Sequence, residues 1–277
     1  MTAINTYATL AEYKEFSVAR GQTGFTDTGD DVVIDNLLEQ ASRYIDDKTA
    51  RWFYPRIELR NYSLPDSRKL LLDADLLAVI TFLNGEDTAI TSGDYHLLPK
   101  NATPYYAIKL TDISSVTWLS DSSGSSEFVL DLTAVFGYHN QYADGWTTGS
   151  TLGEDLDTSE TEWDVASETL FSAGNIIRVD NEIGIVSTTA TGKINVVARG
   201  DNGSTAATHS NGATVEVWQP MEGARQAVLE TAMQAYKRRF GKAEGGIATV
   251  TGAGVVLTPR DIPALTEEFI RVHRRYV

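Results

Sequence analysis

Residues 30–54 carry the clearest hydrophobic periodicity of the chain. Apolar positions recur there at the i, i+3, i+4 and i+7 spacing of one helix face. Asp30 and Asp31 lie where acidic side chains complement the positive end of the helix dipole. The pattern predicts a helix over 30–51 that packs one face on a sheet, runs into an aromatic cluster and stops at Pro55. The predicted face comprises Ile34, Leu37, Leu38, Ala41, Ile45 and Lys48.

Three further helices are predicted. Thr9 followed by Glu12 matches a capping box and begins a short first helix. Helical spacing returns only at Pro220, and that helix closes with a basic run at 237–239 and with Gly241 just beyond its end. A Gly-rich segment, 245–254, is expected to be a flexible loop, and Pro259 and Pro263 precede a last helix over 264–276.

Short alternating segments fill the region between the second helix and residue 142. Turn signals such as Asn84-Gly85 separate them, so they predict an antiparallel sheet. We expect the last strand of this sheet to be the longest. The predicted strands are 57–62, 69–72, 76–84, 95–98, 108–110, 115–119 and 128–138.

The amino-acid composition of the chain changes after residue 142. A Thr-, Ser- and acid-rich stretch leads into a run of short predicted strands that ends at Trp218. Two sequential domains would leave the final helices without a sheet to bury against. We therefore predict one domain from 1–142 and 220–277, with a β-domain inserted at 143–219. The expected class is α+β: a small helical bundle packed with an antiparallel sheet, plus an inserted small all-β domain.

Composition and charge narrow the functional class. The chain has 277 residues, 42% of them hydrophobic, no cysteine and no apolar run long enough to span a membrane. Its start lacks the features of a signal peptide, and a cytosolic origin is expected. The net charge of −15 argues against a general nucleic-acid binder. Only 220–277 is basic, with 9 basic and 6 acidic side chains, and a solvated helix face would also account for that balance.

The sequence contains no complete motif for catalysis or metal binding. The four histidines are far apart, and neither a nucleophile elbow nor a phosphate-binding loop is present. A Gly252-Ala-Gly254 pattern lacks the third glycine of a dinucleotide fingerprint. The alternation of Asp155, Asp157, Ser159 and Glu160 lacks the glycine and distant glutamate of a calcium-binding EF-hand. We predict no enzyme activity, no metal and no cofactor.

The aromatic cluster after the second helix has two interpretations. Arg51, Trp52, Phe53 and Tyr54 resemble in composition a platform on which single-stranded bases stack. The alternative is a hydrophobic plug between helix and sheet or between subunits. We favour packing and name these four residues as candidates for subunit packing.

Four motifs occur in order along the chain. They are Ala-Ser-Arg-Tyr-Ile-Asp-Asp-Lys-Thr-Ala-Arg-Trp-Phe at 41–53, Gly-Asp-Tyr-His-Leu-Leu-Pro at 93–99, Phe-Gly-Tyr-His at 136–139 and the helix from Ala224 to Arg239. Together they resemble the head–tail connector (head completion adaptor) proteins of long-tailed double-stranded-DNA phages. The resemblance covers about 1–142 and 220–277.

This resemblance implies a ring of twelve copies in the virion neck, made in the host cytoplasm. The ring would dock under the portal protein, meet a tail-side neck or tail terminator protein, and let genomic DNA pass without sequence-specific binding. No membrane is expected among its partners. In such adaptors the C-terminal segment reaches into the portal ring. The portal-binding candidates are therefore Leu265, Phe269, Ile270, Arg271, Arg274, Arg275 and Tyr276.

The stretch 143–219 has its own resemblance, to a small β-module of phage structural proteins. Its segment 199–203, Arg-Gly-Asp-Asn-Gly, is interpreted as a tight turn whose side chains are tied down locally, in preference to a ligand site. An alternative function follows from this module: a tail accessory protein whose β-module binds a glycan or a host surface.

Overall fold

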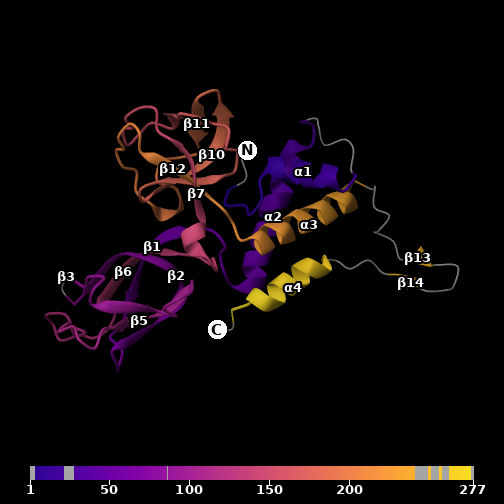
Figure 1. The fold of residues 1–277 in the computed structure, drawn as a ribbon. Coiled ribbons are helices and arrows are strands. Elements are labelled where there is room, and N and C mark those ends of the chain that lie inside the picture. Colours follow the sequence, from indigo (N-terminus) through magenta and orange to yellow (C-terminus); the bar gives the residue numbers. More distant parts are fainter. Residues whose placement is uncertain are drawn as a thin grey trace.

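The computed structural model describes residues 4–21, 28–85, 87–240, 249–250, 256–257 and 262–275. Over these residues the chain forms four α-helices and two six-stranded antiparallel sheets (Figure 1). A further pair of short strands, β13 (Thr249–Val250) and β14 (Val256–Leu257), is also antiparallel. The predicted α+β class is correct. The predictions for Gly241, for the Gly252-Ala-Gly254 pattern and for Pro259 concern positions outside the described residues.

The helices begin close to where the sequence places them. α1 (Leu10–Ala19) starts at the predicted capping box, in which Thr9 Oγ1 accepts the Glu12 N–H at 3.2 Å and the Thr9 N–H donates to the Glu12 carboxylate at 2.7 Å. The other three helices are α2 (Asp31–Thr49), α3 (Glu222–Arg239) and α4 (Ala264–His273).

α2 ends earlier than the sequence suggested. Ala50 adopts a left-handed conformation with φ 54°, and its N–H closes the last turn on the Asp46 carbonyl. The aromatic segment therefore leaves the helix axis instead of continuing it to Pro55. Thr49 is buried, with its hydroxyl donating to the Ile45 carbonyl at 2.8 Å, whereas Lys48 is exposed and does not belong to the buried face.

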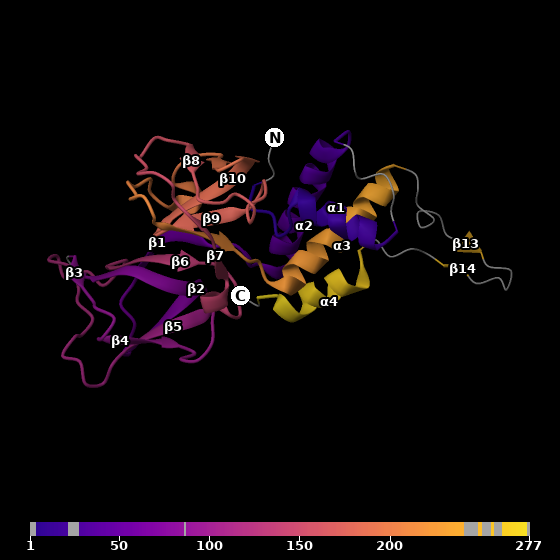
Figure 2. The ribbon, with the colours of Figure 1, turned by 45° about the horizontal axis from the view of Figure 1, so that its top comes forward.

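The buried face of α2 packs mainly on helices, not on the sheet as predicted. Its contacts are with α3, α4 and α1, which cross it as a compact bundle (Figure 2). Small side chains on α3 allow this close approach. The hydrophobic cluster includes Ile34, Leu37, Leu38, Ala41 and Ile45 of α2 and Ala224, Ala227, Val228 and Ala232 of α3. Leu77 and Val135 of the first sheet also belong to it.

The first sheet has the strand order β1-β6-β2-β5-β4, with β3 on β2. Two predicted strands, 69–72 and 76–84, are one 16-residue strand that bulges between Leu71 and Leu76. That strand is the longest, and not the one at 128–138. The predicted strand at 115–119 is irregular. The strands are β1 (Arg56–Tyr62), β2 (Lys69–Asn84), β3 (Thr88–Ala89), β4 (Tyr95–Leu98), β5 (Tyr105–Leu110) and β6 (Leu130–Phe136).

The second sheet has the order β7-β12-β9-β10-β11-β8. A bridge between Leu152 and Val165 joins the two edge strands, so the sheet closes into a small barrel. Trp163 and a set of valines, isoleucines and leucines fill its interior. The strands are β7 (Trp146–Thr151), β8 (Glu162–Asp164), β9 (Ile176–Val179), β10 (Glu182–Ala190), β11 (Lys193–Val196) and β12 (Thr214–Trp218).

The barrel is tied to the rest of the molecule through Trp218. Trp218 is the cross-strand partner of Trp146, so the chain enters and leaves the barrel at adjacent points. The Trp218 ring also packs against Tyr142, and its indole N–H donates to the Phe53 carbonyl at 3.3 Å. Ile183 of β10 belongs to the same hydrophobic cluster as the helices. The barrel core is therefore separate, but its wall is continuous with the helical core.

Candidate assembly surface around the C-terminal helix

The aromatic segment after α2 lies at the centre of the molecule. Phe53 is fully buried, with its ring centroid 5.6 Å from Tyr7, 5.4 Å from Tyr138 and 5.2 Å from Phe269. These rings come from the N-terminal segment, the end of the first sheet and α4. Phe53 is thus the point at which four parts of the chain meet.

The Phe-Gly-Tyr motif fits against this segment through its backbone. The Tyr138 N–H donates to the Trp52 carbonyl at 2.6 Å, and the Gly137 N–H donates to the Asp75 carbonyl at 2.9 Å. Gly137 has φ 149°, and a Cβ there would lie 2.5 Å from the Tyr54 carbonyl oxygen. Both its conformation and its surroundings require glycine.

One face of α4 is committed to the protein's own core. Phe269 is buried and stacks on His273 with ring centroids 4.2 Å apart. Thr266 is also buried, and its hydroxyl donates to the Ala227 carbonyl of α3 at 3.2 Å. Gly223 gives the Phe269 ring room, since a Cβ there would lie 3.0 Å from it. The helix is therefore docked on α3.

Arginine contacts hold the end of α4 in place. Arg51 donates from Nε to the His273 carbonyl at 2.7 Å and pairs with Asp75 at 2.5 Å. The Arg275 N–H donates to the Thr49 carbonyl at 2.8 Å. The Arg51 guanidinium also lies 4.5 Å from the centre of the Tyr138 ring. Asp75 was not singled out from the sequence, because nothing local marks a strand aspartate as the partner of a distant arginine.

The opposite face of α4 is open. Leu265 is 49% exposed and Val272 is 60% exposed, and between them Arg271 pairs with Glu268 on the surface. Arg274 is exposed as well. This surface, Leu265, Glu268, Arg271, Val272 and Arg274, is named here the outer α4 face.

The portal-binding candidates are therefore divided by the fold. Leu265, Arg271 and Arg274 lie on the outer α4 face, whereas Phe269 is buried under the helix. Ile270 and Arg275 are half-buried. Tyr276 lies outside the described residues, and Val272, which the sequence analysis did not select, belongs with the exposed group.

The subunit-packing candidates are divided in a similar way. Trp52 is 39% exposed, and the Arg56 guanidinium lies 3.6 Å from the centre of its ring. Phe53 and Tyr54 are buried within the chain, and Arg51 is engaged with α4. Among these four, Trp52 alone presents a large apolar surface outward.

A buried carboxyl lies beneath the aromatic segment. The Tyr7 hydroxyl donates to Asp46 Oδ1 and accepts the Phe53 N–H at 2.9 Å. Burial raises the pKa of Asp46 to about 7, although the neighbouring Arg43 guanidinium acts in the opposite direction. Sequence analysis missed this pair, since Tyr7 precedes the first helix and Asp46 is an ordinary helix residue until the fold covers it.

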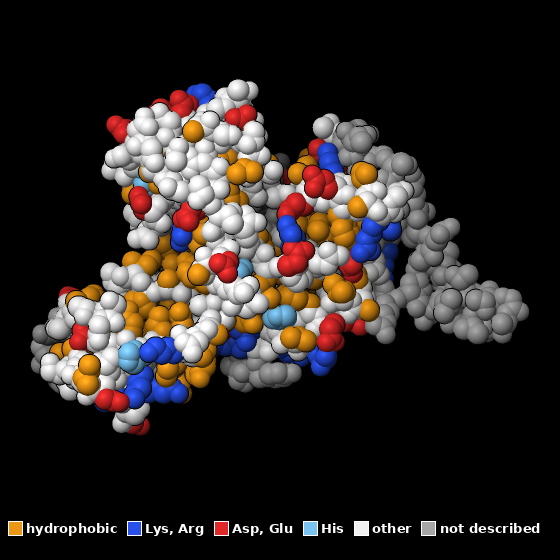
Figure 3. All heavy atoms as spheres, in the orientation of Figure 1, with side chains coloured by type: hydrophobic (Ala, Val, Ile, Leu, Met, Phe, Trp, Pro, Cys, Tyr) orange, Lys and Arg blue, Asp and Glu red, His pale blue; other side chains and the backbone are white. Residues whose placement is uncertain are grey.

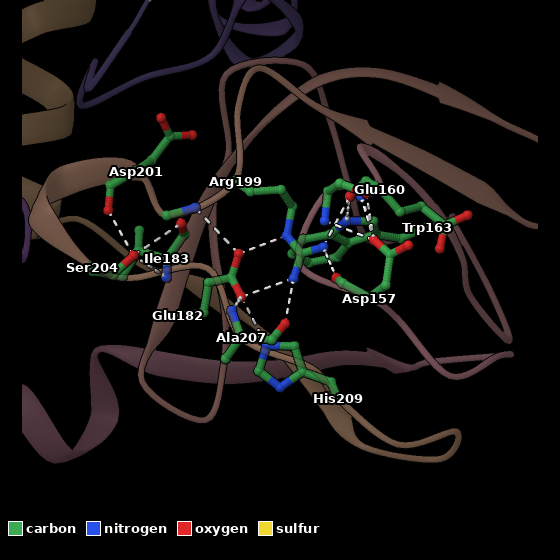
Figure 4. A network of polar contacts seen from close by, with 12 residues as sticks. Asp157, Glu160, Trp163, Glu182, Ile183, Arg199, Asp201, Ser204, Ala207 and His209 are labelled. Atoms are coloured by element: carbon green, nitrogen blue, oxygen red, sulfur yellow. Dashed lines mark hydrogen bonds and ion pairs between the residues drawn. The ribbon is translucent and has the colours of Figure 1, made fainter.

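The segment predicted to be a tight turn is built around Arg199 (Figure 4). The side chains of Arg199 and Glu182 are 5% and 1% exposed, and they form two parallel bonds of 2.6 and 2.9 Å. The remaining guanidinium N–H groups donate to the carbonyls of Asp157, Glu160 and Ala207. All five donors of the guanidinium are used. The predicted turn is present and Arg199 is tied down within the barrel, whereas the side chain of Asn202 bonds to Asn5 outside it.

Glu182 is the second hub of this network. It also accepts the Ala207 N–H at 2.8 Å and faces His209 Nε2 at 2.9 Å. Burial alone would raise the pKa of Glu182, but the bonds from Arg199, Ala207 and His209 outweigh it and hold that pKa below its usual range. The network therefore fixes loops of the barrel.

Other sequence patterns that suggested ligands are accounted for locally. Asp157 Oδ1 accepts the backbone N–H groups of Ser159 and Glu160 at 2.6 and 2.9 Å, which makes a turn of the calcium-like segment. Within the described ranges, no three His, Asp or Glu side chains are grouped to hold a metal ion. In that same part of the chain, no helix is long and apolar enough to cross a membrane.

Comparison with solved structures gives a distant likeness. The chain is similar to a chain from the neck of an empty GTA particle, in a structure computed with C6 symmetry. The two are 21% identical with a TM-score of 0.33, and the match covers 48% of this chain and 68% of the other. No protein-family model and no curated protein matches the chain. We draw no functional conclusion from so distant a likeness.

Proposed function

We propose that this chain is a structural protein of a phage-type virion neck. In this proposal, copies of the chain form a ring between the portal and the tail, and the ring continues the channel through which genomic DNA passes. The outer α4 face binds the portal ring, and the opposite end of the ring meets a tail-side neck or terminator protein.

One observation carries this proposal: two of the motifs that resemble connector proteins, 41–53 and 136–139, meet the C-terminal helix in space. Segments 41–53 and 136–138 meet α4 at Phe53, although they are far apart in the sequence. Gly137 is required by that contact, and Arg51 joins it to the end of α4. Residues of these motifs thus form one contact site that holds the C-terminal helix. This arrangement supports the proposal that the motifs belong to one structural unit of a connector.

The outer α4 face has the composition of a protein-binding surface. It combines two exposed aliphatic side chains, Leu265 and Val272, with the cations of Arg271 and Arg274. Arginine beside apolar groups is common at the centres of interfaces. The buried Phe269 fixes this helix to the subunit, so portal contact would be made by the opposite side of the helix.

The charge of the chain is compatible with a DNA channel that does not retain DNA. A net charge of −15 disfavours phosphate binding, which depends on cationic side chains that release counterions. A duplex would therefore pass such a ring without being held by it.

Surface variants of α4 test the portal contact without disturbing the core. We expect Val272→Asp combined with Arg271→Glu to leave the subunit folded but to prevent its joining portal-bearing, DNA-filled heads. Val32→Asp on α2 is the matched control, because Val32 is 59% exposed and lies on another helix. Joining heads is measured by sedimentation of heads with labelled protein. Normal joining by the α4 variant would exclude this face as the anchor.

A further inference from the structure

Three basic side chains form a row across the outer surface of the first sheet. Lys109 on β5 is the cross-strand partner of Lys69 on β2 and of His96 on β4. Direct cross-strand partners point to the same face, and like charges placed opposite each other destabilise a sheet. Lys109 has an exposed partner in Asp112 at 3.2 Å, and an exposed pair of this kind contributes only about 0–1 kcal/mol to folding.

The neighbouring row on the same face is apolar and partly open. Leu71, Ala107 and Leu98 are cross-strand partners there, and Leu71 is 64% exposed. Tyr106 is 52% exposed, and the Lys69 ammonium lies 5.6 Å from the centre of its ring. Figure 3 shows a broad hydrophobic surface over the first sheet, with Lys, Arg and His side chains gathered at its lower left border. An apolar surface rimmed by cations is typical of a protein-binding site.

The barrel carries the opposite charge. Residues 141–219 hold 12 acidic and 3 basic side chains. Each of the three cations is engaged within the barrel: Arg178 with Glu216, Lys193 with Glu162 and Asp164, and Arg199 with Glu182. The remaining carboxylates therefore have no internal cation to balance them.

The acidic excess is densest in one segment of the barrel. Six of its carboxylates lie between residues 154 and 164. Burial, and then the carboxylates of Glu154, Asp157 and Asp164, raise the pKa of Glu160, which shows that negative charges crowd this segment. A cationic surface set against it would relieve that repulsion.

We propose that the basic row and the apolar row beside it bind the acidic 154–164 segment of a second copy of this chain. The two surfaces belong to different sheets of one subunit, so the contact is head-to-tail and can be repeated around a closed ring. The inference rests on the proposed ring function and specifies which surfaces join its subunits. Lys69 and Lys109 supply the charge complementarity, and Leu71 and Tyr106 supply the apolar contact.

Charge reversal of each surface tests this pairing. The sheet variant carries Lys69→Glu and Lys109→Glu, and the barrel variant carries Glu160→Lys and Glu162→Lys. Self-association is measured by sedimentation velocity at low and high salt, alone and with the portal protein of the same particle. We expect each variant alone to lose at least about tenfold in association constant, because like charges would face each other.

Mixing the two variants distinguishes charge pairing from damage to the fold. The reversed sheet then faces the reversed barrel, the wild-type sheet faces the wild-type barrel, and assembly should return to within about threefold of the wild-type constant. Lys48→Glu with Arg239→Glu is the matched control, since it reverses two exposed helix cations and should assemble normally.

The failures of the two proposals have different signatures. Rings on the portal that both reversed variants still form would overturn the pairing and leave the neck function standing. Wild-type protein that neither self-associates nor joins the portal would contradict the neck function itself. Duplex DNA binding that is lost in the sheet variant, with self-association unchanged, would assign the basic row to nucleic acid and overturn the proposal.

Discussion

Asn5 and Asn202, which are 197 positions apart, exchange two side-chain hydrogen bonds. Each amide donates to the other's oxygen, at 2.7 and 2.9 Å. Both residues adopt positive φ angles, 54° and 52°. Asn202 lies in the 3-10 turn η2 (Asp201–Gly203), whose Gly203 is so close to β1 that a Cβ would lie 2.2 Å from the Ile57 carbonyl oxygen. The segment before α1 is thus bonded to the barrel turn that lies against β1.

Replacing Asn202 tests this contact. Asn202→Gly removes the amide pair but accepts the positive φ, and we expect it to lower the free energy of unfolding by about 1 kcal/mol. Asn202→Ala should cost about 1–2 kcal/mol more, because a Cβ disfavours the left-handed conformation. Chemical denaturation of both variants measures the two effects. An unchanged stability of Asn202→Gly would mean that the amide pair does not fix the barrel.

Arg199 should be among the most sensitive positions of the barrel. Arg199→Met leaves the buried Glu182 carboxylate without its cation, and we expect a loss of about 3–5 kcal/mol in unfolding free energy. Lys193→Met is the control, because its pairs with Glu162 and Asp164 are exposed and such pairs contribute about 0–1 kcal/mol. Comparable losses in the two variants, measured by urea denaturation, would contradict the role of the buried network.

Asp46 should make stability depend on pH. The pKa of Asp46 is about 7 in the folded chain, against an ordinary value of 3.8. At a pH between these two values, Asp46 is protonated in the folded state and ionised in the unfolded state. Its contribution to the unfolding free energy therefore falls as the pH rises from about 4 to about 7 and is constant above that range. Asp46→Asn should remove this slope. Parallel wild-type and variant curves of unfolding free energy against pH would show that Asp46 titrates normally.

We propose that 143–219 is an inserted domain, and deletion tests it. Trp146 and Trp218 are cross-strand partners, so a short Gly/Ser linker can replace 147–217 at little entropic cost. We expect the remainder to unfold cooperatively but at lower denaturant concentration, because the deletion removes Ile176, Ile183 and Ile185 from the shared cluster. Loss of cooperative unfolding would mean that barrel and helices form one inseparable domain.

Local signals predicted the helices well, and tertiary contacts decided the rest. Thr9 and Glu12 act within one turn, so their capping box is visible in the sequence. The end of α2 depends on Ala50 in a left-handed conformation, which alanine rarely adopts and which no local pattern announces. β2 reads as two strands because its bulge between Leu71 and Leu76 interrupts the alternation.

The candidate site shows the same division. The sequence assigned the segment 51–54 to packing and the last helix to portal binding, whereas in the structure the two segments meet at Phe53. The sequence does not distinguish the buried face of α4 from its exposed face, because Leu265 and Phe269 are both strongly apolar. The positions of α3 and Phe53 bury Phe269 and leave Leu265 on the surface.

Electron microscopy of this protein bound to the portal of its own particle tests the neck function most directly. The account predicts a closed ring, coaxial with the portal, with a central channel wide enough for duplex DNA and α4 at the portal side. A protein that remains monomeric or trimeric beside the portal, and binds glycans instead, would contradict it.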